Sequence, residues 1–375
     1  SSGATVTTGG TGFGVMAMTV AAERGFVTRS EACQRVQRIV TFLAERATSY
    51  HGAFSHWIDG QTGQTLPFSA DDNGADLVET GLLFQGLLTA RAYFDGADAA
   101  ESKLRADITA LWEAVEWDFF TKEGTEKVLY WHWSPDKGWA MNMPIQGWNE
   151  ALIVYVLAAS SPTHPIGREV YAEGWARGGA MRNGKLFYDT VLPLGEDYGG
   201  PLFWAQYSFL GLNPRGLSDA YADYWEQVCN HTRINYAYCV DNPKGYAGYG
   251  ADCWGLTASD IPDGYTASSP TNDRGVIAPT AALSSMPYTP DESMAALRFF
   301  YYKLGDKLWS DYGFIDAFDL TTGWFDRGMH IAIDQGPIVV MIENYRTGLP
   351  WNLFMSDKDV QRGLAELGFT VGAGS

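Results

Sequence analysis

The sequence predicts an all-α protein, an (α/α)6 toroid in which inner helices are surrounded by an outer ring. Segments that are apolar on nearly every side alternate along the chain with amphipathic segments. A helix that is apolar all round is buried, whereas an amphipathic helix covers the outside. In addition, 46% of the residues are hydrophobic and 19% are charged, which allows a large core and excludes a disordered chain or a coiled coil. We therefore expect a single domain, residues 1–375.

The first two helix pairs display the alternation most clearly. Residues 11–24 are apolar on nearly all sides, whereas residues 30–47 carry one apolar stripe at helical spacing. Ser30 is expected to cap the second helix. The pattern repeats with residues 76–94, which are apolar almost all round, and residues 101–117, which are amphipathic.

Four later pairs continue the pattern, the pair before last less clearly than the others. Their inner helices are expected at residues 148–159, 200–212, 278–286 and 335–346. Their outer helices are expected at residues 167–176, 218–234, 291–304 and 357–368. A four-helix bundle would need fewer helices, all amphipathic, and a solenoid would show a fixed repeat, which the sequence lacks.

Long segments with little helical pattern precede the inner helices. They cover residues 51–75, 118–147, 177–199, 236–277 and 305–334 and are rich in Trp, Tyr, Gly and Asp. If the inner helices are parallel, their N-termini and these loops open on one face. Long loops at one end of a rigid scaffold are where function usually lies.

Composition excludes several classes of function. A formal net charge of −18 argues against a nucleic-acid partner, because phosphate binding needs a basic surface. No apolar run is long enough to span a membrane, which needs about 18 residues. We expect a monomer that is periplasmic or secreted. Because the start of the chain lacks a signal-peptide core, the signal peptide is expected not to be part of this chain.

The four cysteines contain no CxxC pair, which argues against structural zinc. Cys33 falls in a helical pattern and is expected to be a buried free thiol. One disulfide could form among Cys229, Cys239 and Cys253, which lie within one stretch.

The segment SADDNGADLVETG, residues 69–81, carries acids at the start of an apolar helix: Asp71, Asp72, Asp76 and Glu79. Helix capping and the helix dipole explain one or two of them. They do not explain Glu79, which shares a face with Asp76 inside an apolar segment. Since a buried acid is costly unless it is paired or faces water, we interpret this segment as a functional acidic cluster.

A second acid, Glu150, occurs in PIQGWNEALIVYVLAAS, residues 144–160. Asn149 could cap this helix, and Glu150 would then interact with the helix dipole in its first turn. Except for Asn149, its neighbours from Trp148 to Ala159 are apolar or aromatic, so this helix end is no ordinary solvated surface. We favour a functional role for Glu150.

A third acidic segment is DQGPIVVMIENYRTG, residues 334–348. Asp334 is expected to cap the helix. Glu343 lies three residues before Arg346, so a structural ion pair is favoured over a functional role.

Two carboxyl groups that flank a bond are the machinery of glycoside hydrolysis. Acids at the N-termini of different inner helices would face each other, and burial beside Trp would raise the pKa of a proton donor. Loop residues are expected to bind sugar rings, namely Trp57, Trp131, His132, Trp133, Trp139, Trp148, Trp204, Trp254 and Trp324, together with Asp334.

Other chemistries lack support. The six histidines contain no HExxH motif, and there is no G-x-S-x-G sequence. The string GGTGFG at residues 9–14 follows no predicted strand and lacks the Lys of a phosphate loop. We expect neither a metal ion nor a cofactor in the site; the sequence leaves open whether calcium is bound in an Asp-rich loop.

Five segments together resemble the glucoamylase-like domain of glycoside hydrolase family 144. They are TGFG, DDNGADLVETG, PIQGWNEAL, YGGPLFWAQYSFLGLNPRG and DQGPIVVMIENYRTGLPW, and the resemblance covers essentially the whole chain. It implies an (α/α)6 barrel and hydrolysis of β-1,2-glucan to sophoro-oligosaccharides, with inversion at the anomeric carbon. Some members act in an endo manner, and others release sophorose from an end.

By motif position, the resemblance implies that the essential acids are Asp72, Asp76, Glu79 and Glu150. We interpret Glu150 or Glu79 as the proton donor and Asp76 or Asp72 as the group that orients water. Other readings are a hydrolase or transglycosylase for another glucoside, a glycan-binding protein without activity, and a helical scaffold.

Overall fold

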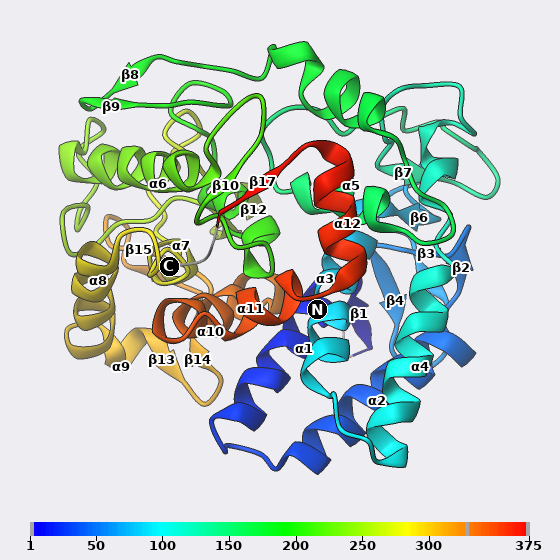
Figure 1. Cartoon of the computed structure of the whole chain (residues 1–375). Helices are drawn as coiled ribbons and strands as arrows, with labels where there is room; N and C mark the ends of the chain where they lie inside the picture. The colour runs from blue at the N-terminus through cyan, green and yellow to red at the C-terminus, as the bar shows by residue number, and fades with distance from the viewer. Residues whose placement is uncertain (1–3, 327–329, 373–375) are drawn as a thin grey trace.

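Helices dominate the computed structural model, which describes residues 4–326 and 330–372 (Figure 1). The α-helices are α1 (Thr8–Glu23), α2 (Arg29–Glu45), α3 (Leu77–Tyr93), α4 (Ala99–Glu113), α5 (Leu152–Ser160), α6 (Tyr224–Asp241), α7 (Pro279–Leu283), α8 (Pro290–Tyr302), α9 (Gly305–Leu308), α10 (Ala332–Arg346), α11 (Leu349–Met355) and α12 (Lys358–Leu367). Shorter 3-10 or π turns are η1 (Trp117–Thr121), η2 (Val170–Trp175), η3 (Arg177–Gly179), η4 (Leu202–Ala205) and η5 (Tyr207–Leu210). The prediction of a helix-rich chain is confirmed.

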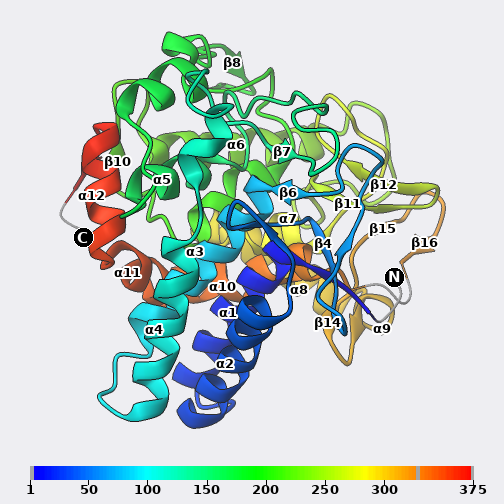
Figure 2. The same ribbon diagram turned by 90° about the vertical axis from the view of Figure 1, so that its right-hand side faces the viewer.

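Short antiparallel strands decorate the helices, which the prediction of a purely α-helical chain had not included. They are β1 (Thr5–Thr7), β2 (Ser49–Tyr50), β3 (Ala53–Phe54), β4 (Trp57–Asp59), β5 (Thr65–Leu66), β6 (Ala75–Asp76), β7 (His132–Trp133), β8 (Leu186–Phe187), β9 (Thr190–Val191), β10 (Leu217–Ser218), β11 (Ala258–Ile261), β12 (Gly264–Ala267), β13 (Trp309–Ser310), β14 (Gly313–Phe314), β15 (Phe318–Asp319), β16 (Trp324–Phe325) and β17 (Thr370–Val371). Strands β4, β6, β7, β11, β12 and β15 gather on the side opposite α11 and α12 (right in Figure 2).

Helices α3 and α5 lie in the core, whereas α1 and α10, which the sequence also predicts to be inner helices, each keep exposed residues on one side. Helix α1 packs against α3 and α10, and α5 packs against α3 and α12. Helices α2 and α4 pack together on the outer side of α1 and α3 (Figures 1 and 2). Nearly every residue of α3 and all of α5 are buried, as the absence of a polar face predicts.

Helices α1 and α3 approach each other unusually closely. A Cβ atom on Gly12 would lie 2.3 Å from the carbonyl oxygen of Leu82, and one on Gly86 would lie 2.1 Å from the carbonyl oxygen of Gly12. Only glycine fits at these two positions, because real Cβ atoms do not come this close. The close crossing places the N-terminus of α1 next to the N-terminus of α3.

Residues 200–212 do not form the single inner helix that the sequence predicts. They form η4 and η5, because a side chain from α3 satisfies their backbone in place of helical hydrogen bonds. The Gln85 amide donates to the carbonyl of Tyr207 at 2.9 Å and accepts from the Gly211 N–H at 2.7 Å. The expected outer helix 167–176 is also reduced, to the π turn η2.

Several predicted helix ends are wrong. Thr28 and Glu31 form the capping box of α2, so Ser30 is not the cap. Helix α6 begins only at Tyr224, because the Asp219 carboxylate holds the backbone of Tyr221 and Ala222 in a turn.

The C-terminal half also corrects two predicted contacts. Glu343 pairs with Arg24, at 2.6 and 2.8 Å, and not with Arg346, although its role is structural as expected. All four cysteines are free and buried, so no disulfide joins Cys229, Cys239 or Cys253. Within the described ranges, no helix is both long and apolar enough to cross a bilayer.

Candidate active site

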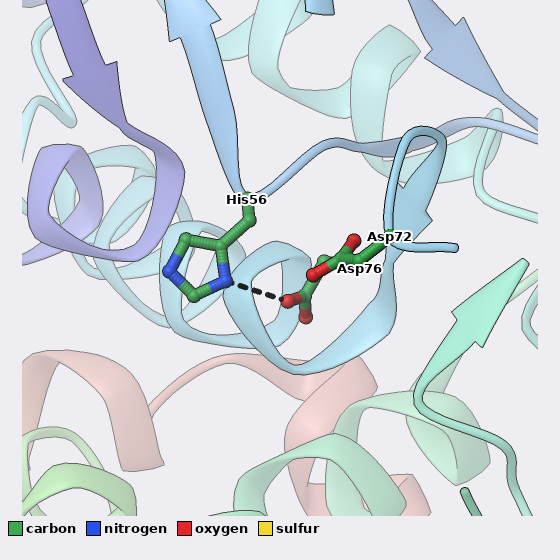
Figure 3. Close-up of side chains that lie close together, drawn as sticks. All are labelled: His56, Asp72 and Asp76. Atoms are coloured by element: carbon green, nitrogen blue, oxygen red, sulfur yellow. Dashed lines mark hydrogen bonds and ion pairs between the residues drawn. The ribbon is translucent and has the colours of Figure 1, made fainter. Parts of the chain in front are cut away.

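Asp76 is the N-cap of α3 and the centre of a hydrogen-bonded acidic network. Its Oδ1 accepts the N–H groups of Val78 at 3.0 Å and Glu79 at 2.9 Å, which a helix N-terminus otherwise leaves unpaired. Its Oδ2 accepts a hydrogen bond from Nδ1 of His56 at 3.0 Å (Figure 3). Asp76 is fully buried, and the hydrogen bond and charge of His56 lower its pKa despite that burial.

Asp72 and His132 lie next to Asp76. Strand β6 pairs with β7 and places His132 opposite Asp76. Nε2 of His132 lies 3.5 Å from Oδ2 of Asp72 and 3.8 Å from Oδ2 of Asp76. Figure 3 shows the Asp72 carboxyl next to that of Asp76. Burial and the neighbouring charge of Asp76 raise the pKa of Asp72.

Glu79 lies in the first turn of α3 and is almost completely buried. Its Oε2 accepts the N–H of Gly9 at 2.6 Å, and its Oε1 lies 4.0 Å from Nε2 of His56. Burial raises the pKa of Glu79 to about 7. Although burial lowers the pKa of His56, the charges of Glu79 and Asp76 raise it to about 9. His56 is therefore protonated at neutral pH and bridges the two acids.

Glu150 comes from a different segment, the turn before α5. Because α5 begins at Leu152, Glu150 precedes the helix, and the prediction that it lies in the first turn is wrong. The turn is fixed by two contacts: Asn149 Oδ1 accepts the N–H of Ala151 at 2.9 Å, and the Ser208 hydroxyl donates to the Glu150 carbonyl. Burial, with the charges of Asp76 and Glu79, raises the pKa of the Glu150 carboxyl to about 7.

These acids open onto one cavity of about 500 Å³. Asp76, Glu79 and Glu150 contribute carboxyl groups to its wall. The aromatic part of the wall consists of His56, Trp57, Phe68, Trp131, Phe203, Tyr207 and Tyr265. An enclosed hollow with mostly apolar walls and a few convergent polar groups is the usual form of a small-molecule site.

The structure separates the expected sugar-binding residues into groups. Trp57 and Trp131 line the cavity. Trp133 and Trp139 pack on Phe119, outside the residues that line the cavity. Trp204 and Trp324 are half-buried, and neither lines the cavity; His132 is buried behind Asp76.

Two of the expected tryptophans belong to the hydrophobic core. Trp148 is buried, and its Nε1 donates to His231. Trp254 is fully buried, and its Nε1 donates to the carbonyl of Glu292. Neither ring is available to a sugar, so we no longer count these two residues as substrate contacts.

Asp334 holds two tyrosines of the cavity wall. It lies in the first turn of α10, where Ile331 is the N-cap, so the prediction that Asp334 caps the helix is wrong. The hydroxyl of Tyr207 donates to it at 3.0 Å and that of Tyr265 at 3.3 Å. Burial and the charge of Asp316 raise the pKa of Asp334 well above its usual range.

Sequence reasoning missed six residues of the site: Gly9, His56, Phe68, Phe203, Tyr207 and Tyr265. Gly9 belongs to the string GGTGFG, which carries the signal of an unusual helix start. Tyr207 falls in the motif YGGPLFWAQYSFLGLNPRG. His56 precedes Trp57 without any informative spacing, and Tyr265 has no sequence signal.

The network at α3 also has the residue types of a metal site. His56, Asp72 and Asp76 each offer one ligand atom within 4.8 Å of the others. However, backbone N–H groups occupy one oxygen of Asp76, and the His56 ring donates to the other. The arrangement therefore favours holding protons over holding a metal ion.

Comparisons with known proteins point to one family. The "Glycoamylase" family model, described as "Putative glucoamylase", matches residues 142–358. The exo β-1,2-glucooligosaccharide sophorohydrolase (non-reducing end) of Parabacteroides distasonis is 47% identical over 382 aligned residues. That alignment covers 96% of this chain and 53% of the relative, so the chain spans about half the length of that curated protein.

Solved structures agree with the sequence comparison. An endo-β-1,2-glucanase of Chitinophaga pinensis, in complex with sophorotriose and glucose, is 52% identical and has a TM-score of 0.95. The match covers 98% of this chain and 88% of that one. An endo-β-1,2-glucanase of Talaromyces funiculosus is 12% identical with a TM-score of 0.69, covers 97% of this chain and 80% of that one, and is similar in fold alone.

Proposed function

The chain belongs to the glucoamylase-like family of glycoside hydrolase family 144, and on that premise we propose that it hydrolyses β-1,2-glucan. One observation carries the proposal. Two glutamic acids, Glu79 and Glu150, come from the starts of two different core helices, and the pKa of each is raised to about 7 beside one aromatic cavity. Paired carboxyl groups of this kind are what glycosidic bond cleavage requires.

We further propose that the helices form an (α/α)6 toroid built as one domain over residues 1–375, and that the protein works as a monomer outside the cytoplasm. The packing of α10 against both α1 and α7 supports a single domain, because it joins the two halves of the chain. The alternation of buried helices, such as α3, with amphipathic ones, such as α12, supports the toroid.

Glu150 is the proton donor in this mechanism. Burial, with the charges of Asp76 and Glu79, raises its pKa to about 7, so a large fraction of it carries a proton near neutral pH. The Ser208 hydroxyl donates to its carbonyl, and Asn149 Oδ1 accepts the N–H of the next residue, Ala151, so the turn that carries the side chain is fixed. A protonated carboxyl at a fixed position can deliver its proton to the glycosidic oxygen as the bond breaks.

Glu79 is the carboxylate that activates water. The Gly9 N–H and the protonated His56 ring both stabilise its ionised form, unlike the surroundings of Glu150. Asp76 positions His56 and the first turn of α3. Asp72 lies next to Asp76 and is not among the residues that line the cavity. In an inverting reaction, Glu79 would take the proton of the water that attacks from the face opposite the leaving group.

The aromatic wall supplies the sugar contacts. Trp57 and Trp131 offer ring faces to the apolar sides of glucose units, and the tyrosines held by Asp334 offer hydroxyl groups at fixed positions. A wall of this composition binds a neutral sugar through stacking and hydrogen bonds, which agrees with the strongly negative chain.

Product analysis tests the proposal directly. The purified protein is incubated with linear β-1,2-glucan and with a β-1,3- and a β-1,4-glucan, and the anomeric configuration of new ends is followed by NMR. We expect sophorose or longer β-1,2-linked oligomers released as α-anomers. Sophorose from the start of the reaction would indicate exo action, and a ladder of oligomers would indicate endo action. Cleavage of another glucan but not of β-1,2-glucan would contradict the substrate assignment.

A further inference from the structure

A second acidic cluster lies apart from the network at α3. Asp260 belongs to β11, Asp316 lies in the loop between β14 and β15, and Asp326 directly follows β16. Each offers one carboxylate oxygen, and these three oxygens lie within 4.8 Å of one another. The β11 strand thus meets the two ends of the β15–β16 hairpin, which lies much further along the chain, and their acids come to one point.

The carboxylates of this cluster are poorly satisfied by the protein. Asp316 is fully buried; its Oδ2 accepts the N–H of Asp260 at 2.7 Å. Its Oδ1 is buried and accepts no hydrogen bond from an N–H or hydroxyl group in the part of the chain that the structure describes. The same holds for the buried Oδ2 of Asp326. Among the described residues, no Lys, Arg or His forms an ion pair with any of the three acids.

A buried carboxylate oxygen that no donor satisfies is strongly unfavourable, so an external partner is expected. We propose that Asp260, Asp316 and Asp326 bind a divalent cation of the calcium type. Calcium takes oxygen ligands at about 2.3–2.6 Å with flexible geometry, and two such ligands on opposite sides of the ion lie about 4.8 Å apart. The separation of the three oxygens fits that sphere, and backbone carbonyls or water would complete it.

The site would fix one wall of the cavity. Asp260 stands on β11, which pairs with β12, and β12 carries Tyr265. The Tyr265 hydroxyl reaches Asp334, whose pKa is raised in part by the neighbouring charge of Asp316. A cation held by Asp260, Asp316 and Asp326 would tie the β11–β12 hairpin to the loops before β15 and after β16. It would thereby hold Tyr265 against the cavity.

Shared protons are the competing explanation. Burial and mutual repulsion raise the pKa of Asp316 to about 7 and that of Asp326 to about 6. A protonated carboxyl can donate to its neighbour, as the contact between Asp316 and Asp334 would allow. The two explanations differ in their response to metal ions.

Thermal unfolding and calorimetric titration test the proposal without any glucan substrate, so their outcome is independent of the proposed function. The whole chain is treated with EDTA, dialysed, and supplied with CaCl2, MgCl2 or neither. We expect saturable binding of one Ca²⁺ per chain and a rise in Tm of several degrees. Asp316→Asn and Asp326→Asn should each weaken Ca²⁺ binding at least tenfold. Asp263→Asn, an exposed change of the same type in the turn between β11 and β12, should leave it unchanged.

Three outcomes would overturn the proposal. In the first, Tm and heat do not respond to Ca²⁺, while Asp316→Asn is as stable as the wild type at neutral pH, as shared protons predict. In the second, Ca²⁺ has no effect and Arg327→Gln, at a position outside the described residues, destabilises as much as Asp326→Asn. In the third, only Mg²⁺ binds, which contradicts calcium. If Asp316→Asn does not fold, the titrations of the wild type and of Asp326→Asn decide.

Discussion

The two acidic clusters of this protein contain the same type of side chain in opposite electrostatic surroundings. At α3, Asp76 and Glu79 receive backbone N–H groups and share the protonated ring of His56. At the other cluster, Asp316 and Asp326 each keep a buried oxygen that no described N–H or hydroxyl group satisfies. Burial raises pKa values in both clusters, so burial alone does not distinguish them. Internal donors and a counter-charge suit the first cluster to proton chemistry. The described residues supply neither a donor to these two oxygens nor an ion-pairing side chain at the second cluster, which suits it to binding an ion.

The comparison also shows why the two glutamic acids of the cavity have different roles. Glu79 has donors that stabilise its charge, and Glu150 has acidic neighbours that oppose its charge. Burial raises the pKa of both groups to about 7, so the different partners, and not different pKa values, assign the base role to Glu79 and the acid role to Glu150.

Glu150→Gln gives the largest expected effect on turnover. The amide keeps the shape of the side chain but cannot donate the proton, so kcat on β-1,2-glucan should fall by about 10³-fold or more. Initial rates and circular dichroism measure activity and folding together. The exposed variant Glu169→Gln serves as the control and should keep wild-type turnover. A folded Glu150→Gln enzyme with near-normal kcat would remove Glu150 from the mechanism.

Asp76→Asn should have the next largest effect, because it weakens both contacts of the network. The loss of the full charge at Oδ2 should lower the pKa of His56, and Glu79 then loses its cationic neighbour. We expect kcat to fall about 10²-fold. The free energy of unfolding should fall by about 1.5–3 kcal/mol, because the His56 ring loses its charged acceptor, whereas Asn still caps the helix. Asp98→Asn, at the N-cap of α4, is the matched control and should change neither kcat nor stability. Unchanged kcat in both variants would make Asp76 a helix cap and nothing more.

Trp131→Ala and Trp254→Ala should separate the cavity from the core. Removal of the Trp131 ring should raise KM about tenfold or more, since stacking on one sugar unit is lost. The Trp254 variant should lose about 3–5 kcal/mol of stability, with KM unchanged in the protein that still folds. Substrate titrations and urea unfolding supply both quantities. A KM effect for Trp254→Ala at full stability would place that ring in the site after all.

The sequence predicted the core better than the site, for physical reasons that particular residues illustrate. A helix that is buried on all sides must be apolar on all sides, so α3 and α5 were predictable from composition alone. Residues 200–212 are equally apolar, but the Gln85 side chain takes over their backbone hydrogen bonds, and no periodicity reveals such a distant partner.

The residues of the site also divide into those that the sequence could predict and those that it could not. Glu79 was predictable, because an acid in an apolar helix needs an explanation. His56 was not, because its link to Asp76 exists only after folding. Both Trp131 and Trp254 were predicted to bind sugar because they lie in loops, but Trp131 lines the cavity and Trp254 is buried in the core.

The smallest expected effect concerns stability as a function of pH. The pKa of Glu150 is raised to about 7 in the folded protein, above its usual value of about 4.3. The folded state therefore binds this proton more tightly than the unfolded state does. The stability that this contributes is fully present below pH 4.3 and is lost as the pH rises through about 7.

Glutamine at position 150 removes this dependence. The free energy of unfolding of Glu150→Gln minus that of the wild type should therefore rise by about 1 kcal/mol from pH 5 to pH 8. The figure is small because Glu150 is partly exposed. Urea unfolding of both proteins at the two pH values measures the difference. Asp76, which accepts hydrogen bonds from several donors, should behave in the opposite way. Its pKa is lowered in the folded protein, so it stabilises the fold at pH values above the usual pKa of an Asp, and this stabilisation is lost as the pH falls. If both positions gave the same sign, the electrostatic contrast between Glu150 and Asp76 would be wrong.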